Sequence, residues 1–369
     1  EYLEAAASRL GEETSLPALR EVVHIFCTSE DINNLAYALT IKAATEQVWL
    51  PAIRALLDRL RGLAEAGAAV PMLAHTHGQP ATPVTVGKEM AVFAHRLSRQ
   101  IKRVEATEYL GKINGATGTW AAHVVSVPGA DWPTLARAFV EGLGLTWNPL
   151  TTQIESHDWQ AELYADVARA GRIAHNLATD AWTYISMDYF HQNLAAQGST
   201  GSSTMPHKVN PIRFENAEAN LEVSNALLDS LGATLVTSRM QRDLTDSTTQ
   251  RNVGVAFGHA VLAYDNLVRG LDGIEINAAR MARDLDANWA VLGEAVQQAM
   301  RAAAIAGATG MANPYERLKE LTRGHEVGER DMREFIAGLG LPAEVEERLL
   351  ALTPATYIGL SERLARWEA

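Results

Sequence analysis

The sequence contains almost no cysteine, since Cys27 is the single one among 369 residues. One thiol excludes an intramolecular disulfide framework and suits a protein kept in a reducing compartment. A free cysteine is most often a small buried hydrophobe, and we interpret Cys27 in that way.

Long apolar runs are also absent. No run could span a bilayer, and the first residues lack the pattern of a signal peptide. We therefore expect a soluble, cytoplasmic protein with no membrane partner. The sequence shows no internal repeat, no βαβ alternation and no low-complexity tract beyond alanine-rich helical stretches, which argues against a parallel-sheet fold.

Positive charge is scarce, because 32 lysines and arginines face 44 acidic residues and the net charge is −12. This balance argues against a nucleic-acid partner. It also means that an anionic substrate would need a site that gathers its own cations. With 47% hydrophobic residues, the chain can bury a large core over two or three domains.

The stretch from 198 to 216 changes abruptly from a loop composition to a helix composition. Its first half, GSTGSSTM, is small and polar and has no apolar periodicity. Asn210 is then a suitable N-cap, and Pro211 fits the first position of a helix. Unpaired N–H groups at such a helix start, together with Lys208, favour an anion. The sequence therefore predicts a mobile loop that leads into a site for a carboxylate substrate.

Other polar islands precede predicted helices. Thr28 and Ser29 are capping residues, and Asp31 follows Thr28 at the spacing of a capping box, before a helix that Pro51 is expected to kink. At the end of the second island, residues 74–83, a Thr-Pro dipeptide predicts the start of another helix. These islands should present anion-binding helix starts.

The remaining segments also read as helices. A helix is expected over about 159–187, and Ser247 with Gln250 has capping-box spacing for a later one. The only strand-like signal lies around 124–129. The first eleven residues resemble the tail of a helix, so we expect a missing N-terminal portion. We predict an all-α fold, a long-helix bundle with a smaller C-terminal helical domain, divided into an N-terminal remnant (1–22), a central helical-bundle domain (23–270) and a C-terminal helical domain (271–369).

Several of these motifs resemble one known family. Residues 201–211, GSSTMPHKVNP, resemble the loop G-S-S-x-M-P-x-K-x-N-P of the fumarase/aspartase superfamily, and the histidine in it points toward the adenylosuccinate lyase family. Segments 28–34 and 76–83 resemble two further motifs of that family. The runs KING at 112–115, TTQ at 151–153 and RDLTDS at 242–247 are similar to its bacterial pattern.

The resemblance implies a lyase of purine biosynthesis that performs β-elimination of fumarate. Its substrates would be adenylosuccinate, which gives AMP, and the related succinylated aminoimidazole carboxamide ribotide. It implies a homotetramer of long helices whose sites take motifs from three subunits, with no cofactor. The family's N-terminal domain, which carries an Arg-Tyr pair for the nucleotide phosphate and a His-Asp motif, is not found at the start of this sequence.

The resemblance also assigns residue roles. Ser202 would be the base, and Lys208 would favour its ionised form. His77 would be the acid, with Glu215 orienting it. The substrate would be held by Thr28, Ser29, Thr76, Gln153, Ser203, Asn210, Arg242, Ser247 and Arg251.

Three of these assignments have an alternative. Ser203 could replace Ser202 as the base, and Glu215 could merely complement the dipole at a helix start. Ser247 could cap its helix, with or without contacting the substrate. Three further polar residues are interpreted as having no direct role in the reaction. His157 is expected to form a local hydrogen bond, and Lys88 and Arg213 are expected to be solvated or structural.

Three other interpretations compete with this prediction: a metal site, a different lyase and a non-catalytic assembly. The paired histidines His75 and His77 could suggest a metal site, but no matching Cys/His set lies nearby and we expect no metal. The chain could be a different fumarate-releasing lyase of the superfamily, although an arginine-bearing segment at 242–251 favours a phosphorylated substrate. It could also be a catalytically impaired fragment that acts only as a helical assembly.

Overall fold

The computed structural model describes residues 22–193, 205, 208–322 and 327–366. These residues form mainly α-helices with a few short strands, which confirms the predicted all-α class. Within the described ranges, no helix is long and apolar enough to cross a membrane.

The chain forms two compact units. Unit 1 combines residues 1–53, 100–172 and 219–263, and unit 2 combines 54–99, 173–218 and 264–369. Each unit therefore joins three separate stretches, and the long helices contribute residues to both. The predicted boundaries at residues 22 and 270 stay predictions.

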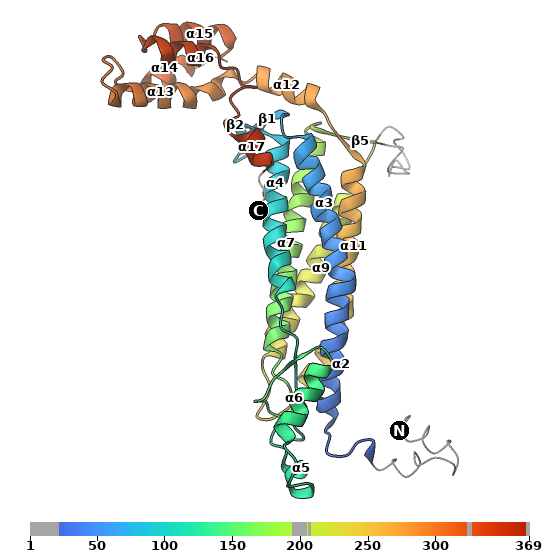
Figure 1. Cartoon of the computed structure of the whole chain (residues 1–369). Helices are drawn as coiled ribbons and strands as arrows, with labels where there is room; N and C mark the ends of the chain where they lie inside the picture. Colours follow the sequence, from blue (N-terminus) through green and yellow to red (C-terminus); the bar gives the residue numbers. More distant parts are fainter. Residues whose placement is uncertain (1–21, 194–204, 206–207, 323–326, 367–369) are drawn as a thin grey trace. The chain divides into compact units, whose positions relative to one another are not determined.

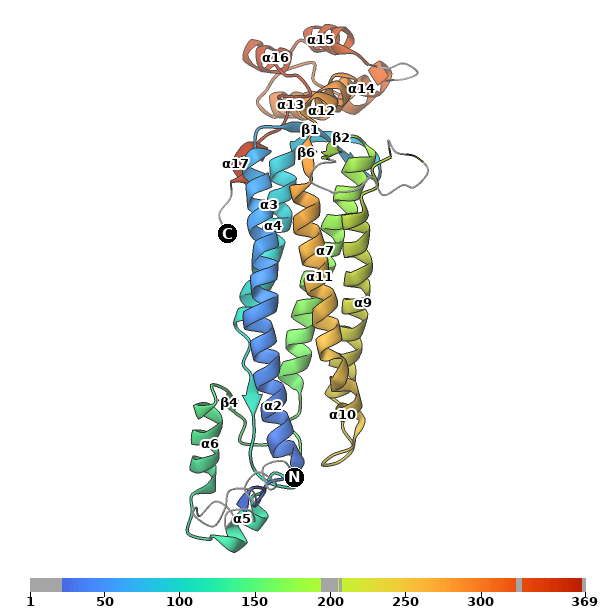
Figure 2. The ribbon, with the colours of Figure 1, turned by 90° about the vertical axis from the view of Figure 1, so that its right-hand side faces the viewer.

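Unit 1 begins with helix α2 (Ser29–Ala44), a π-helical segment η2 (Thr45–Trp49) and the start of α3 (Leu50–Ala66). The π turn lies directly before Pro51, which has no N–H to donate and whose ring crowds the preceding turn. The expected disturbance at Pro51 thus takes the form of a π turn. Figures 1 and 2 show the helix continuing through it.

The rest of unit 1 packs segments of long helices with short connecting elements. Strands β3 (Leu110–Gly111) and β4 (Thr146–Trp147) pair in parallel. The helices, some of which continue into unit 2, are α4 (Val86–Glu105), α5 (Ala121–Ser126), α6 (Trp132–Gly142), α7 (Asp158–Ser186), α9 (Ile212–Leu235), α10 (Thr245–Thr249), η3 (Gln250–Asn252) and α11 (Val253–Asp272).

Unit 2 contains a hairpin of β1 (Pro71–Thr76) and β2 (Gln79–Thr85), and β5 (Phe190–Gln192) pairs antiparallel with β6 (Ile274–Ile276). Its shorter helices are α12 (Ala278–Asp286), η4 (Trp289–Leu292), α13 (Gly293–Ile305), α14 (Pro314–Thr322), α15 (Glu329–Ala337), α16 (Ala343–Leu350) and α17 (Ser361–Ala365). Helices α13 to α16 gather together (Figures 1 and 2) around an apolar cluster that includes Val296, Met300, Met332 and Ile336.

Three local predictions were wrong. Residues 124–129 were expected to be extended, but α5 covers 121–126. Ser247 was expected to cap a helix, but it lies inside α10. The dipeptide Thr82-Pro83 was expected to start a helix, but it belongs to β2, and α4 begins at Val86.

The hairpin explains the third error. Met72 pairs with Val84 and Ala74 pairs with Ala81, so Thr82 and Pro83 together face one residue of β1. This is a β-bulge, and a bulge tolerates a proline because the extra residue leaves the ladder of hydrogen bonds. Pairing with a distant strand has overridden a local helix signal.

Helices α3 and α4 approach each other closely at two glycines of unit 2. The Gly87 N–H donates to the Gly67 carbonyl at 2.9 Å. A Cβ on Gly87 would lie 2.2 Å from the carbonyl oxygen of Ala64 and 2.5 Å from the nitrogen of Ala68. Both neighbours are backbone atoms and cannot rotate away, so this contact requires glycine.

We expect Gly87→Ala to lower the free energy of unfolding by roughly 1–3 kcal/mol, because the added methyl group overpacks two backbones. Gly62→Ala is the matched control, since Gly62 is exposed in α3 and a Cβ there would meet only Arg59 Nη1 at 4.0 Å. That control should gain about 0.5–1 kcal/mol from helix propensity. Urea titration of both variants tests the contact, which is refuted if both variants gain stability.

Candidate active site

The first motif of unit 1 is organised by a buried ion pair. Helix α2 has Thr28 as its N-cap, and the Thr28 N–H donates to Asp31 Oδ2 at 2.9 Å, so the predicted capping-box spacing is real. The Lys112 ammonium donates to Asp31 Oδ1 at 2.8 Å, and neither side chain is exposed to solvent. Burial lowers the pKa of Lys112, while the bond to Asp31 opposes that change.

Further bonds bring two more polar segments, 151–153 and 241–243, to this point. The Arg242 guanidinium pairs with Glu30 at 3.0 Å and donates to Gln153 Oε1 at 3.3 Å. Gln153 in turn donates to the carbonyl of Ala116 at 2.9 Å. The side chain of Asn114 donates to Thr151 Oγ1 at 2.7 Å. A closed chain of bonds therefore connects residues 28–34, 112–116, 151–153 and 241–243.

The segment that follows Arg242 is also polar and ordered by local bonds. The Thr245 N–H donates to Asp243 at 2.9 Å, and such bonds lower the pKa of Asp243 to about 2. The Ser247 N–H donates to Asp246 Oδ1 at 2.7 Å, and Ser247 is half-buried. Arg251 is exposed in η3, where a guanidinium can reach a ligand.

His157 is buried at the start of α7. Its φ is +63°, and its Nε2 lies 2.9 Å from the amide nitrogen of Gln250. Glu155 accepts hydrogen bonds from the His157 N–H at 2.9 Å and from the Trp159 indole at 3.1 Å. The imidazole of His157 thus contacts a residue far away in the sequence and not a local partner, and among the described residues its Nδ1 is buried without a hydrogen bond, so the role of His157 stays a prediction.

The second motif lies in unit 2, on the β1–β2 hairpin. Thr76 pairs with Gln79, so His77 and Gly78 form a two-residue connection, with φ values of +54° and +73°. Positive φ at both central residues is typical of a type I′ turn, in which glycine is favoured. This turn holds the imidazole of His77 at an exposed hairpin tip.

The residues after the loop also lie in unit 2. The Lys208 N–H donates to the Met205 carbonyl at 2.9 Å, and the Lys208 side chain is exposed. Asn210 is half-buried, and α9 starts at Ile212, so the residue directly before the helix is Pro211 and the predicted cap at Asn210 is wrong by one position. Glu215, in the first turn of α9, accepts a hydrogen bond from the Trp182 indole at 3.2 Å.

Ser202 and Ser203 lie outside the described residues, so the structure does not place the predicted base or its alternative. Where the chain is described, no group of three or more His, Cys, Asp or Glu side chains could hold a metal ion. Of the residues given structural readings, Lys88 pairs with Glu89 at 2.8 Å and Arg213 donates to Asn266 at 3.1 Å.

A cavity of about 620 Å³ lies beside the hairpin in unit 2, and His75 and Thr76 are among its lining residues. Its acidic lining residues are Glu89, Asp180 and Glu294, and Lys88 is the lysine among its lining residues. Burial, with the charge of Glu89, raises the pKa of Asp180. An excess of carboxylates disfavours an anionic ligand, so this cavity does not by itself suit a succinyl group.

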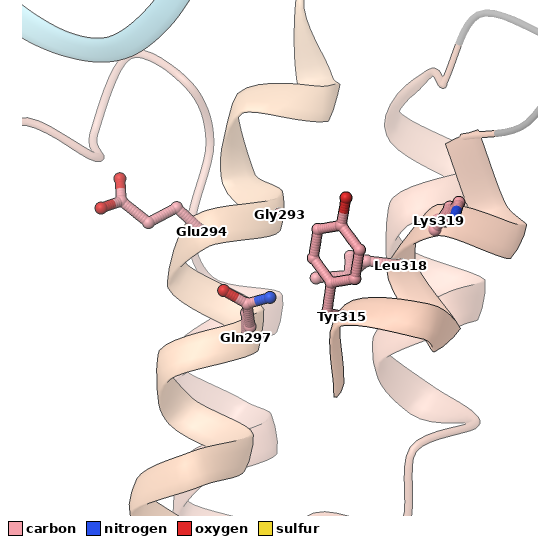
Figure 3. A pocket seen from close by; sticks show the side chains of 6 residues that line it. All are labelled: Gly293, Glu294, Gln297, Tyr315, Leu318 and Lys319. Carbon is pink, nitrogen blue, oxygen red and sulfur yellow. The ribbon is translucent and has the colours of Figure 1, made fainter. Parts of the chain in front are cut away.

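A smaller hollow of about 290 Å³ lies between α13 and α14 (Figure 3). Tyr315 and Lys319 stand on one side, with Glu294 and Gln297 on the other. None of the predicted site residues lines it.

The structure therefore groups the predicted residues in two sets. Unit 1 contains Thr28, Ser29, Gln153, Arg242, Ser247 and Arg251, and unit 2 contains Thr76, His77, Lys208, Asn210 and Glu215. Sequence reasoning missed the connecting residues, above all Lys112 and Asn114. Their polar KING run was noticed, but nothing local predicts that a lysine is fully buried.

Two family models match most of the chain. A model described as "Lyase" matches residues 3–226, and one described as "Adenylosuccinate lyase C-terminal" matches residues 238–358.

Two solved structures show the fold alone, because their sequence identities are low. The fumarate lyase from Mesorhizobium sp. BNC1 is 21% identical with a TM-score of 0.78, over 98% of this chain and 80% of that chain. The 3-carboxy-cis,cis-muconate lactonizing enzyme from Pseudomonas putida is 22% identical with a TM-score of 0.75, over 98% and 79%.

Curated relatives are much more similar in sequence. The chain is 49% identical to adenylosuccinate lyase of Escherichia coli K12 over 351 residues, which are 95% of this chain and 75% of that protein. It is 48% identical to adenylosuccinate lyase of Haemophilus influenzae over 356 residues, or 96% and 76%. With family models that together match most of its length, the chain belongs to the adenylosuccinate lyase family.

Proposed function

We propose that this protein eliminates fumarate from adenylosuccinate, giving AMP, and from succinylated aminoimidazole carboxamide ribotide. The observation that carries the proposal is the 49% identity to an adenylosuccinate lyase over 95% of the chain. The bond network of unit 1 supports it, because it holds four motif segments of the family pattern together. The reaction removes a proton from carbon, breaks the C–N bond to form the double bond of fumarate and protonates the departing nitrogen; no electrons are gained or lost overall, so it needs no cofactor.

In this proposal, Ser202 removes the proton beside a substrate carboxylate. A hydroxyl is a weak base at neutral pH, so its ionised form needs a positive environment. Lys208 and the start of α9 follow the loop directly and would supply that environment.

His77 then protonates the departing amine nitrogen. A hairpin tip with positive φ holds its imidazole in the open, where a substrate can reach it. Glu215 would favour the charged form of this imidazole, and its bond to Trp182 fixes its carboxylate. In the alternative, Glu215 complements only the dipole at the start of α9.

Different residues would bind the succinyl group and the nucleotide of the substrate. Thr28, Ser29, Thr76, Ser203 and Asn210 would hold the carboxylates of the succinyl group. Gln153 would contact the substrate directly, in an orientation fixed by Arg242. Ser247 and Arg251, with Arg242, would face the nucleotide, where an exposed arginine suits a phosphate.

We further propose a cytoplasmic homotetramer with shared sites. The support is the division of the predicted residues of one chain between two compact units. Several subunits can bring different motifs together, whereas helices of one subunit would spread them. The scarcity of cysteine suits the reducing cytoplasm.

Replacing the base should stop the reaction. We expect Ser202→Ala to abolish turnover of adenylosuccinate while substrate binding stays near that of the wild type, because the hydroxyl acts only when the proton moves. The assay follows the release of AMP and fumarate from adenylosuccinate. A separate assay with fumarate and water tests the competing fumarase activity. Ser203→Ala is the comparison and should keep measurable turnover. If Ser202→Ala stays within about tenfold of the wild type, Ser203 becomes the candidate base.

Replacing the acid should also lower kcat. His77→Asn should reduce it by roughly 10²- to 10⁴-fold, since that is the usual contribution of general acid catalysis. Glu215→Gln should have a milder effect and shift the pH–rate profile. Trp182→Phe, which removes the observed donor but keeps the carboxylate, should leave the profile in place. An unchanged pH–rate profile in Glu215→Gln would show that Glu215 does not affect the ionisation of the acid, His77.

Shared sites predict complementation. Ser202→Ala and His77→Asn should both be inactive, and their mixture should recover activity after dissociation and reassembly. In a mixed tetramer some sites would draw the serine from one chain and the histidine from another. Each variant reassembled alone is the control. Mixed tetramers that native mass spectrometry confirms and that remain inactive would show that one chain supplies both residues.

A further inference from the structure

The carboxylate of Asp31 accepts more hydrogen bonds than a helix cap requires. Oδ1 accepts from the Lys112 ammonium at 2.8 Å and from the Asn114 N–H at 3.0 Å. Oδ2 accepts from the Thr28 N–H at 2.9 Å and from the Gly115 N–H at 3.1 Å. One carboxylate thus connects the start of α2 to residues 112–115.

Asn34, one turn further along α2, strengthens this connection. Its Oδ1 accepts from the Lys112 N–H at 2.9 Å, and its Nδ2 donates to the Lys112 carbonyl at 3.0 Å. Asn34 is buried, and its amide pairs with the backbone of Lys112 in both directions. The turn at 112–115 is therefore fixed in position and in orientation.

A fully buried ion pair is a poor way to gain stability. Removing two charges from water costs free energy that their attraction often fails to repay, and hydrophobic substitutes of similar size are often as stable. The geometry here offers another role. Residues 112–116 hold Gln153 through the Ala116 carbonyl, and Glu30 on α2 holds Arg242, which holds Gln153 from its other side.

We propose that Asp31 and Lys112 are positioning residues for binding of the succinyl substrate. They fix Thr28 and Ser29, at the start of α2, relative to the turn that orients Gln153. This inference rests on the proposed function, in which Thr28 and Ser29 hold carboxylates and Gln153 contacts the substrate. Neither Asp31 nor Lys112 touches the substrate in this proposal.

The role depends on both oxygens of a carboxylate. In Asp31→Asn one oxygen becomes an NH₂ group, which donates and cannot accept. That group would face an N–H of Thr28 or of the turn, so at least one of these donors would lose its acceptor. The single variant also leaves the Lys112 ammonium buried without a counter-charge, which is strongly destabilising.

A double substitution separates positioning from stability. Asp31→Asn/Lys112→Met removes both buried charges and keeps the volume of the lysine stem. We expect its melting temperature to recover toward that of the wild type, above that of Asp31→Asn. We expect KM for adenylosuccinate to stay raised by roughly 10- to 100-fold with a smaller change in kcat, because the displaced groups bind the substrate in the ground state as well as in the transition state.

Ser224→Ala is the matched control for destabilisation in unit 1. Ser224 is buried and donates to the Ala256 carbonyl at 2.8 Å, outside the four connected segments. It should lower the melting temperature and leave KM within about twofold of the wild type. If KM and melting temperature both recover in the double variant, the positioning role is overturned and the proposed function still stands. A wild-type protein that does not cleave adenylosuccinate would overturn the proposed function, and the positioning role with it.

Discussion

A carboxylate and an ammonium group that are both fully buried must lie together, and Asp31 with Lys112 meets that constraint. Because Lys112 must reach the first turn of α2, the turn that follows it comes to lie there too. In this position Gln153 donates a hydrogen bond to the Ala116 carbonyl. Arg242 pairs with Glu30 and donates a hydrogen bond to Gln153. One desolvated ion pair therefore anchors the arrangement of the polar segments in unit 1.

Charge poses the main functional problem for this chain, since a protein of net charge −12 is proposed to bind an anionic substrate. In unit 1, the charge of Arg242 is already balanced by Glu30. In unit 2, the cavity beside the hairpin has more carboxylates than ammonium groups. The other two cations proposed for the substrate, Lys208 and Arg251, are exposed side chains in different units. This distribution supports a site completed by other subunits.

Much of the fold could be predicted because its signals are local. The cap at Thr28, the long helix near 159–187 and the shorter C-terminal helices all follow from periodicity and capping residues. The hairpin at 71–85 could not be found in this way, because a strand and its partner stabilise each other. The two-residue connection His77-Gly78 was the available signal, since glycine there favours a hairpin turn.

The sequence by itself determined the helical class, the family resemblance and the identity of the candidate residues, because these depend on patterns within short segments. The tertiary structure alone decided which segments meet. It buried Lys112 against Asp31 and divided the candidates between two units. It also placed His77 on a hairpin tip, where a helix start was expected nearby. These outcomes depend on partners far apart in the chain, since the cost of burying a charge or leaving a strand unpaired is settled only when the partner is in place.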